Sequence, residues 1–211
     1  MEAVVKREAA HGRRELTKVQ NRETILAAAR KVFAEIGFGA ATVRDIIRAT
    51  PLASGTFYNY FKSKEEVYQA IRDDVALAIR PRLREERIKA DTVEAFISGS
   101  FRTFFDFVCG NREDFRHLRR DASRFRLDTP EVIAGFDELR EDLETAMAQG
   151  LFAQVDADYL MAAIVGVAFE VSERMLQRQE SDPAEVAAFA TALFLGGVRA
   201  LPQRRQAGPT D

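Results

Sequence analysis

The chain has 211 residues, 46% of them hydrophobic and 30% charged, with a single cysteine, Cys109. This composition allows a sizeable core and excludes collagen-like, disordered and disulfide-scaffold proteins. The longest uncharged apolar run, residues 186–198, is shorter than the about 18 residues that a membrane-spanning helix needs. The basic N-terminus lacks the apolar segment of a secretory signal, so we expect a soluble, cytoplasmic protein that does not bind membranes.

Charge is distributed unevenly along the chain. Residues 1–64 hold 12 Lys and Arg against 6 Asp and Glu, a net charge of +6. Of the totals of 31 and 33, this leaves 19 basic and 27 acidic residues in the rest, a net charge of −8. Such a division is expected if the first segment binds a polyanion, although chance variation of surface charge explains it equally well.

Apolar residues recur at helical spacing along the whole chain, and no stretch alternates clearly enough to predict a strand. Residues 1–18 are polar and basic, which predicts a flexible arm that either contacts DNA or keeps the chain soluble. The basic residues of this arm are Lys6, Arg7, Arg13, Arg14 and Lys18.

Two helices are predicted directly after the arm. The first starts near Asn21 and ends at Gly37 and Gly39. The sequence Thr42–Asp45 has the form of a capping box, in which a hydroxyl and a carboxylate bond the free N–H groups of the first turn. It starts a second helix, which Pro51 stops after about two turns.

A short third helix is predicted over residues 54–61, followed by a fourth that opens with a capping box at 63–66 and breaks at Pro81. The tight turn between the second and third helices predicts a helix-turn-helix. Four more helices are predicted, starting at Asp91–Thr92, Thr129–Pro130, Asp156 and Asp182–Pro183. The first ends near Cys109, the second near Gly150 and the last before Pro202. A poorly defined piece covers 112–126, and a disordered tail covers 203–211.

Two stretches, ILAAARKVFAEIGFGAATVRDI (25–46) and SGTFYNYFKSKEEVY (54–68), carry a resemblance to a known family. Residues 21–70 resemble the N-terminal domain of TetR-family transcriptional regulators. The resemblance implies an all-α homodimer, with a helix-turn-helix domain at 19–66 and a larger helical ligand-binding and dimerisation domain at 67–202. It also implies a double-stranded DNA partner with a palindromic operator.

The third predicted helix offers the side chains that we expect to contact DNA, because the second helix of a helix-turn-helix enters the major groove. Arg44 matches the family position that reaches a base, and Thr42 caps its helix beside a phosphate. Lys64 is the expected phosphate anchor, with Lys62 second, because the free N–H groups of a helix start attract an anion. The expected DNA-binding residues are Thr42, Arg44, Ser54, Gly55, Thr56, Tyr58, Asn59, Tyr60, Lys62 and Lys64.

The turn before the third helix departs from the family pattern. Family members typically have Ala-Gly-Val-Ser where this chain has Thr50-Pro51-Leu52-Ala53. The usual hydroxyl cap is thereby replaced by Ala53. We expect Ser54 or Thr50 to take over the capping, which leaves the start of the reading helix open.

The predicted helices that start at Asp156 and at Asp182–Pro183 are apolar on more than one side. Each must therefore be buried on two sides. Resembling proteins pair these helices with their symmetry mates in a four-helix bundle, and a core helix of a monomer is the alternative. The expected dimer-interface residues are Ile164, Val167, Val171, Met175, Phe189, Leu193, Phe194 and Gly197.

Phenylalanine is crowded between residues 96 and 136, where eight of the 16 phenylalanines lie beside several arginines. An apolar pocket with cations at its mouth suits an amphipathic anion such as a fatty acid or acyl-CoA, and the stretch FRHLRRDASRF is weakly similar to fatty-acid-responsive family members. Plain core packing with solvated arginines is the alternative. The expected ligand-binding residues are Phe101, Phe104, Phe105, Phe115, Arg116, Arg119, Phe136 and Phe169.

These observations predict a ligand-responsive regulator, and first of all a repressor, that a small amphipathic or hydrophobic effector releases from its operator. The two histidines, His11 and His117, do not lie at metal-ligand spacing, and no nucleophile-elbow, Walker or dinucleotide motif is present. We therefore expect no catalytic residues, metal or cofactor. The alternatives are an activator or nucleoid-type DNA binder on the same fold, and an all-helical enzyme or carrier with a fortuitous helix-turn-helix.

Overall fold

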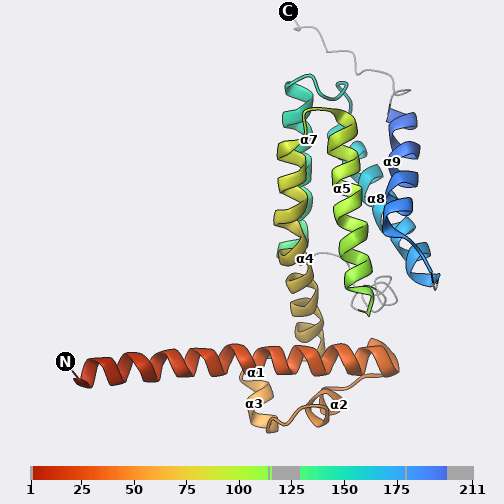
Figure 1. Cartoon of the computed structure of the whole chain (residues 1–211). Coiled ribbons are helices and arrows are strands. Elements are labelled where there is room, and N and C mark those ends of the chain that lie inside the picture. Colours follow the sequence, from red (N-terminus) through yellow and green to blue (C-terminus); the bar gives the residue numbers. More distant parts are fainter. Residues whose placement is uncertain (1, 114, 116–128, 179, 199–211) are drawn as a thin grey trace, which may run out of the picture. The chain divides into compact units, whose positions relative to one another are not determined.

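The computed structural model describes residues 2–113, 115, 129–178 and 180–198, with side chains from Gly12 onward except that of Val198. Over these residues the protein consists of helices and connecting turns, which confirms the predicted all-α fold. The helices are α1 (Glu2–Ala40), α2 (Val43–Arg48), α3 (Ser54–Tyr58), α4 (Lys64–Lys89), α5 (Val93–Gly110), α7 (Pro130–Ala148), α8 (Ala157–Gln177) and α9 (Pro183–Val198) (Figure 1).

The chain forms two compact units, Met1–Arg72 and Asp73–Asp211, which we call unit 1 and unit 2. Helix α4 contributes residues to both, because the division falls inside it. The expected tail at 203–211 and most of the poorly defined piece at 112–126 lie outside the described residues.

Helix α1 begins much earlier than the sequence predicted. The segment expected as a flexible arm is helical from Glu2 onward. It is rich in Ala, Glu, Lys and Arg, which favour helix, and Gly12 is its only strong helix-disfavouring residue. At the other end the helical backbone is interrupted at Gly37, whose φ of 78° and ψ of 152° suit glycine and agree with the predicted end.

The capping box predicted before α2 is present. The Thr42 hydroxyl accepts from the Asp45 N–H, and the Asp45 carboxylate accepts from the Thr42 N–H at 3.0 Å. Helix α3 is shorter than predicted and starts after Ala53, which provides no side-chain cap. Neither expected residue takes over this role: the Thr50 hydroxyl instead closes the preceding turn, donating to the Ile47 carbonyl and accepting from the Leu52 N–H.

The core of unit 1 is assembled from all four of its helices. Ile25 and Leu26 of α1, Ile46 of α2, Phe57 of α3 and Val67 of α4 are almost completely buried. Aromatic rings extend this core at the end of α1, where the Phe38 ring lies 5.3 Å from Phe33 and 4.8 Å from Tyr68. Because each helix gives one buried stripe, its polar residues are left on the outside.

Pro81 does not break α4, contrary to the sequence prediction. The helix continues eight residues further, to Lys89. Proline removes one helical hydrogen bond and disfavours a helix interior, but this part of α4 is held by side chains. Ile79 is buried in the core of unit 2, and Arg80, Arg84 and Arg87 form ion pairs with α7.

Unit 2 packs α5, α7, α8 and α9 with the C-terminal part of α4. Its core is rich in aromatic residues, and α5, which provides Phe96, Phe101 and Phe105, contacts α9 most extensively. Small residues let α4 approach its neighbours closely. A Cβ on Gly99 of α5 would lie 3.0 Å from the Glu86 carboxylate, and one on Gly135 of α7 would lie 3.3 Å from the Arg80 side chain.

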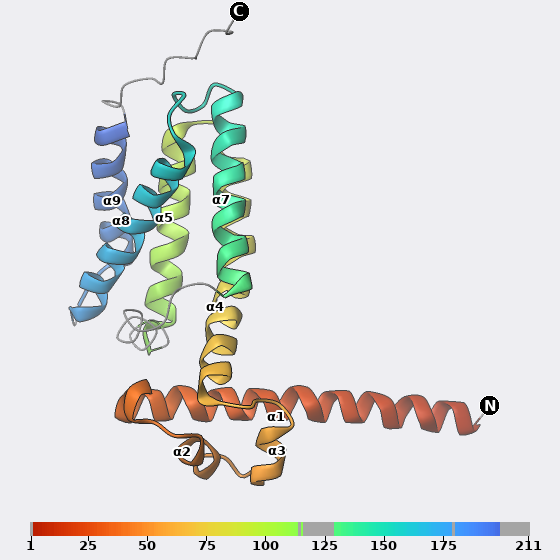
Figure 2. The same cartoon turned by 180° about the vertical axis from the view of Figure 1, so that it is seen from behind.

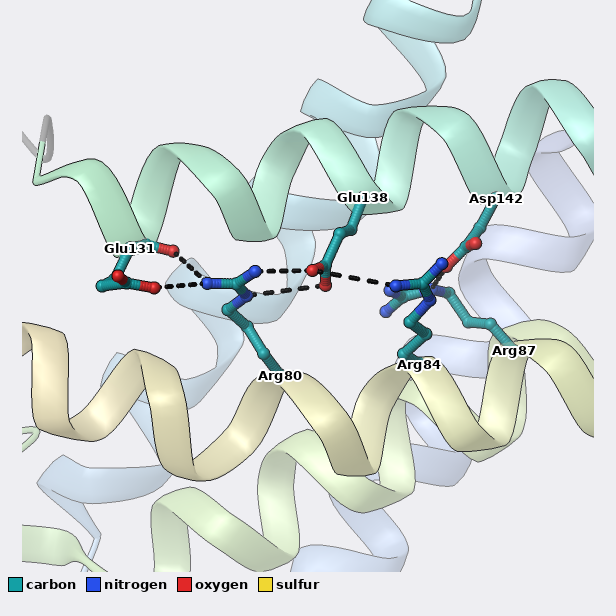
Figure 3. A network of polar contacts seen from close by, with 6 residues as sticks. All are labelled: Arg80, Arg84, Arg87, Glu131, Glu138 and Asp142. Atoms are coloured by element: carbon teal, nitrogen blue, oxygen red, sulfur yellow. Dashed lines mark hydrogen bonds and ion pairs between the residues drawn. The ribbon is translucent and has the colours of Figure 1, made fainter.

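A row of ion pairs joins α4 to α7 (Figure 3). Arg80 binds Glu131 at 2.6 Å and Glu138 at 2.5 Å, and Arg87 binds Asp142 at 2.7 Å. The Arg87 side chain is only 4% exposed. The hydrogen bond from Arg80 lowers the pKa of Glu138, with partial burial opposing this shift.

No helix in the described part of the chain is long and apolar enough to span a membrane.

Candidate functional site

The exposed side of α3 carries most of the residues expected to meet DNA. Phe57 of α3 and Phe61, which follows the helix, are buried, and their rings lie 6.1 Å apart. The opposite side presents Ser54, Gly55 and Asn59 to solvent, with Thr56 half-buried. Tyr58 is 57% exposed, and its ring packs edge-on against Phe57. The buried stripe thus fixes a short polar surface that faces outward.

Helix α2 carries one of the expected DNA-binding cations. Arg44 is exposed, and in the described part of the chain its guanidinium has no carboxylate within ion-pair distance. Thr42, one residue before the helix, donates its hydroxyl proton to the Asp45 carboxylate at 2.6 Å. This hydrogen bond and that from the Thr42 N–H lower the pKa of Asp45. The hydroxyl of Thr42 is therefore already used in the capping box.

Tyr60 lies just after α3 and is tied to α1. Its phenol oxygen accepts a hydrogen bond from the Asn21 side-chain amide at 3.4 Å, and its ring is half-buried. Sequence reasoning used Asn21 only as the start of a helix. The structure adds Asn21 as the residue that links α1 to Tyr60, at the end of the candidate reading segment, by which we mean residues 54–60.

The two lysines before and at the start of α4 are placed differently. The Lys64 ammonium donates to the carbonyls of Phe38 (2.8 Å), Ala41 (2.7 Å) and, more distantly, Gly39 (3.4 Å), and lies 4.6 Å from the centre of the Phe38 ring. An ammonium has three donors, so all of them are directed at the C-terminal end of α1. Lys62, by contrast, has an exposed side chain. The structure thus gives the expected first phosphate anchor a structural role and leaves Lys62 available.

The residues expected to bind a ligand are mostly part of the unit 2 core. Phe101, Phe104, Phe105 and Phe115 are buried. Ring contacts join Phe104 to Phe115 at 6.1 Å and to Phe169, from α8, at 5.5 Å. Phe136 is half-buried on α7 and is not part of this core cluster. Arg116 and Arg119 lie outside the described residues.

One arginine next to this region has a defined structural role that the sequence did not indicate. Arg112, which follows α5, donates to the carbonyls of Arg178 at 2.8 Å and Leu176 at 3.5 Å. It therefore caps the end of α8. Such a long-range contact leaves no local signal in the sequence.

The expected dimer-interface residues separate into two groups. Ile164, Met175 and Phe194 are buried in the core of their own chain, and Val167 and Val171 are half-buried against it. Phe189 and Leu193 on α9 are 59% and 57% exposed, and Gly197 one turn further is exposed as well. Two large apolar side chains one turn apart thus lie open on α9.

Comparison with known proteins agrees with the geometry of unit 1. Residues 25–71, which include α2, α3 and the start of α4, match the family "Bacterial regulatory proteins, tetR family". The chain belongs to the TetR family. As a TetR-family protein it is a DNA-binding transcriptional regulator with a helix-turn-helix.

Relatives extend this family assignment over most of the chain. The HTH-type transcriptional regulator YdgC of Bacillus subtilis is 26% identical over 188 residues, which are 85% of this chain and 93% of that protein. Among solved structures, the fatty acid degradation regulator FadR of Bacillus halodurans is 26% identical, with a TM-score of 0.73 over 85% of this chain and 96% of its own.

A second solved structure shares the fold at lower identity. It is the transcriptional regulator FadR of Bacillus subtilis in complex with stearoyl-CoA, 20% identical, with a TM-score of 0.70 over 83% of this chain and 98% of its own.

Proposed function

We propose that this TetR-family regulator is a repressor that binds a palindromic operator as a homodimer and is released by an amphipathic acyl effector. The observation that carries the DNA-reading part is the division of α3 into two sides. Phe57 is buried, whereas Ser54, Gly55 and Asn59 are exposed, and Arg44 of α2 is exposed as well. An exposed polar surface on a short helix, backed by a packed core, is the geometry that enters a major groove.

Roles within this surface follow from side-chain chemistry. Among the described residues the planar guanidinium of Arg44 has no carboxylate partner, and such a group suits the two acceptors of guanine. Asn59 has the amide that pairs with adenine. Lys62 and Tyr60 suit phosphate oxygens, which position the protein without reading sequence. Lys62 replaces Lys64 as the proposed phosphate anchor, because the donors of Lys64 are directed at carbonyls of its own chain.

The homodimer is supported by an exposed apolar stripe on α8 and α9. Phe189 and Leu193 project from α9, and small exposed residues lie on the same sides of the two helices. These small residues are Ala162, Ala163, Gly166, Ala188, Ala192, Gly196 and Gly197. Large exposed apolar side chains beside small ones allow close helix packing, and exposed apolar patches mark protein interfaces. The two-fold symmetry of such a dimer matches the symmetry of a palindrome.

The acyl effector is supported by the fold shared with a FadR structure that holds stearoyl-CoA and by the aromatic cluster at Phe104, Phe115 and Phe169. A thioester or fatty acid would place its chain among these rings, and Arg116 and Arg119 would bind its anionic head. Its effect on DNA binding is limited by its relative affinity for the DNA-bound and released states.

Selection of bound duplexes from a random pool, followed by gel retardation and sedimentation, tests the DNA-reading proposal. We expect a palindrome that binds two copies of the chain, and displacement by stearoyl-CoA. Phe189→Glu with Leu193→Glu should abolish the two-copy complex without unfolding the chain. A protein that selects no sequence, or that binds as one copy, contradicts the proposal.

Arg44→Ala tests base reading within the selected site. We expect it to reduce discrimination at one base pair of each half-site by about 1–3 kcal/mol. Binding to unrelated DNA should change little. The affinities of the variant for the selected site and for its single-base substitutions give the result. Equal losses on all duplexes would assign Arg44 to the DNA backbone instead.

A further inference from the structure

The N-terminal half of α1 extends beyond the packed part of unit 1. Every residue from Gly12 to Gln20 is exposed, and the helix continues to Glu2 (Figures 1 and 2). At a rise of about 1.5 Å per residue, the part before Asn21 is about 30 Å long. It is therefore a long helical projection. Its described side chains contribute nothing to the core, so core packing does not determine which residues they are.

One face of this projection is aligned with the candidate DNA-binding surface. Asn21 marks the side of α1 that contacts Tyr60, at the end of the reading segment. Lys18 and Arg14 precede Asn21 by three and seven residues, a spacing that places all three on one face of a helix. Arg13 borders the same face. The side of α1 that contacts the reading segment thus continues toward the N-terminus as a basic face.

The two arginines on this face are available to a ligand. Arg13 and Arg14 are exposed, and among the described residues neither guanidinium has a carboxylate partner. Lys18 differs, because its ammonium binds Glu15 at 2.8 Å, a contact that raises the pKa of the lysine. The unbalanced positive charge of the described segment is therefore concentrated at Arg13 and Arg14.

We propose that this projection is a second DNA-contacting element, in which Arg13 and Arg14 bind backbone phosphates outside the base pairs read by α3. The proposal rests on the proposed operator binding and extends it along the duplex. Exposed, unpaired guanidinium groups on a rigid helix suit phosphate oxygens, and contacts of this kind raise affinity for every sequence alike. The length of DNA that each subunit contacts would then depend on the length of α1.

The opposite side of the projection carries two exposed apolar residues, which favour a protein partner instead of DNA. Leu16 and Val19 are 72% and 60% exposed and lie three residues apart, away from Arg14 and Lys18. They would pack against a protein rather than DNA. The basic face is the stronger feature, because it continues the face that contacts Tyr60.

The test compares wild type with the double variant Arg13→Gln/Arg14→Gln on the selected operator carried in a long duplex. Each phosphate contact contributes about 0.9 to the slope of log K against log salt concentration. The proposed homodimer loses four such contacts, two from each subunit, so raising salt from about 50 to 200 mM should weaken wild type roughly 150-fold more than the variant. On a duplex cut back to the operator itself, the two proteins should show equal slopes.

Two controls separate this result from other causes. Arg102→Gln removes an exposed arginine from α5 in unit 2 and should keep the wild-type slope on both duplexes. Leu16→Gln/Val19→Gln should also keep it. Circular dichroism checks that each variant retains its helix content.

The results that overturn the proposal are distinct from those that overturn operator binding. If wild type binds the operator and the arginine variant has the same slope on the long duplex, the projection does not contact DNA. The proposal also fails if only the Leu16/Val19 variant loses affinity, because the projection then serves a protein contact. Failure of wild type to bind any duplex would instead reject the proposed function itself.

Discussion

The two units of this regulator use the same helical architecture in opposite ways. In unit 1 apolar residues such as Ile46 and Phe57 form the core, and polar residues such as Ser54 and Asn59 lie outside it. In unit 2 the residues expected to bind a ligand are themselves the core, as Phe101 and Phe105 illustrate. A binding surface outside a core can change its side chains without repacking, whereas a binding site inside a core cannot. DNA specificity and effector specificity should therefore respond differently to mutation.

Polar residues also have different structural roles in the two units. Unit 2 joins α4 to α7 through charged pairs that are largely buried, such as Arg87 with Asp142. Unit 1 instead uses one lysine, Lys64, to bind the carbonyl end of α1. Three predictions test how strongly each unit depends on these contacts.

The largest effect is expected for Arg87→Met, because it leaves the largely buried carboxylate of Asp142 without its cation. We expect the free energy of unfolding to fall by about 3–5 kcal/mol. The double variant Arg87→Met/Asp142→Leu should regain most of this loss, because a well-packed apolar pair removes the unpaired charge. Urea denaturation measures both. A double variant as unstable as the single one would show that the pair is needed for more than charge balance.

A smaller effect is expected for Lys64→Met, which removes the hydrogen bonds to the Phe38 and Ala41 carbonyls. The expected loss of stability is about 1–3 kcal/mol. Lys62→Met is the matched control, since it should leave stability unchanged and lower affinity for all DNA sequences. Denaturation curves and gel retardation on the same preparations separate the two roles. The reverse pattern would restore Lys64 as the phosphate anchor.

The smallest effect concerns pH. The pKa of Glu138 is lowered in the folded protein by its hydrogen bond from Arg80. Its contribution to stability is therefore present above its unfolded pKa and is lost as pH falls through the folded value. Glu138→Gln and Arg80→Gln should each flatten the acid side of the stability–pH curve. Thermal melts between about pH 3 and 6 measure this slope, and an unchanged slope in both variants would refute the assignment.

Local signals in the sequence predicted most of unit 1 correctly. The Thr42–Asp45 capping box, the end at Gly37 and the inward position of Phe57 all depend on residues within a few positions of each other. Two predictions were wrong at positions where helix propensity and tertiary packing decide the structure. Residues 2–18 are helical because of their composition, and α4 continues past Pro81 because ion pairs and burial hold the next turns.

Long-range partners could not be predicted from the sequence. Nothing near Lys64 indicates that its ammonium binds carbonyls more than 20 residues earlier, and the same holds for Arg112 and the end of α8. The phenylalanines show a further limit. A crowded set of rings predicts an apolar interior, but the same set serves a ligand cavity or a filled core equally well.

Pro81 has one consequence for how α4 moves. Because proline has no N–H, the carbonyl of Leu77 lacks its usual helical partner, and the turn between these residues is the natural bending point of the helix. This turn lies just inside unit 2, a few residues past the division at Arg72 and Asp73. Bending at this turn would move the residues of α4 before Leu77 relative to Arg84 and Arg87, which lie beyond it and pair with α7.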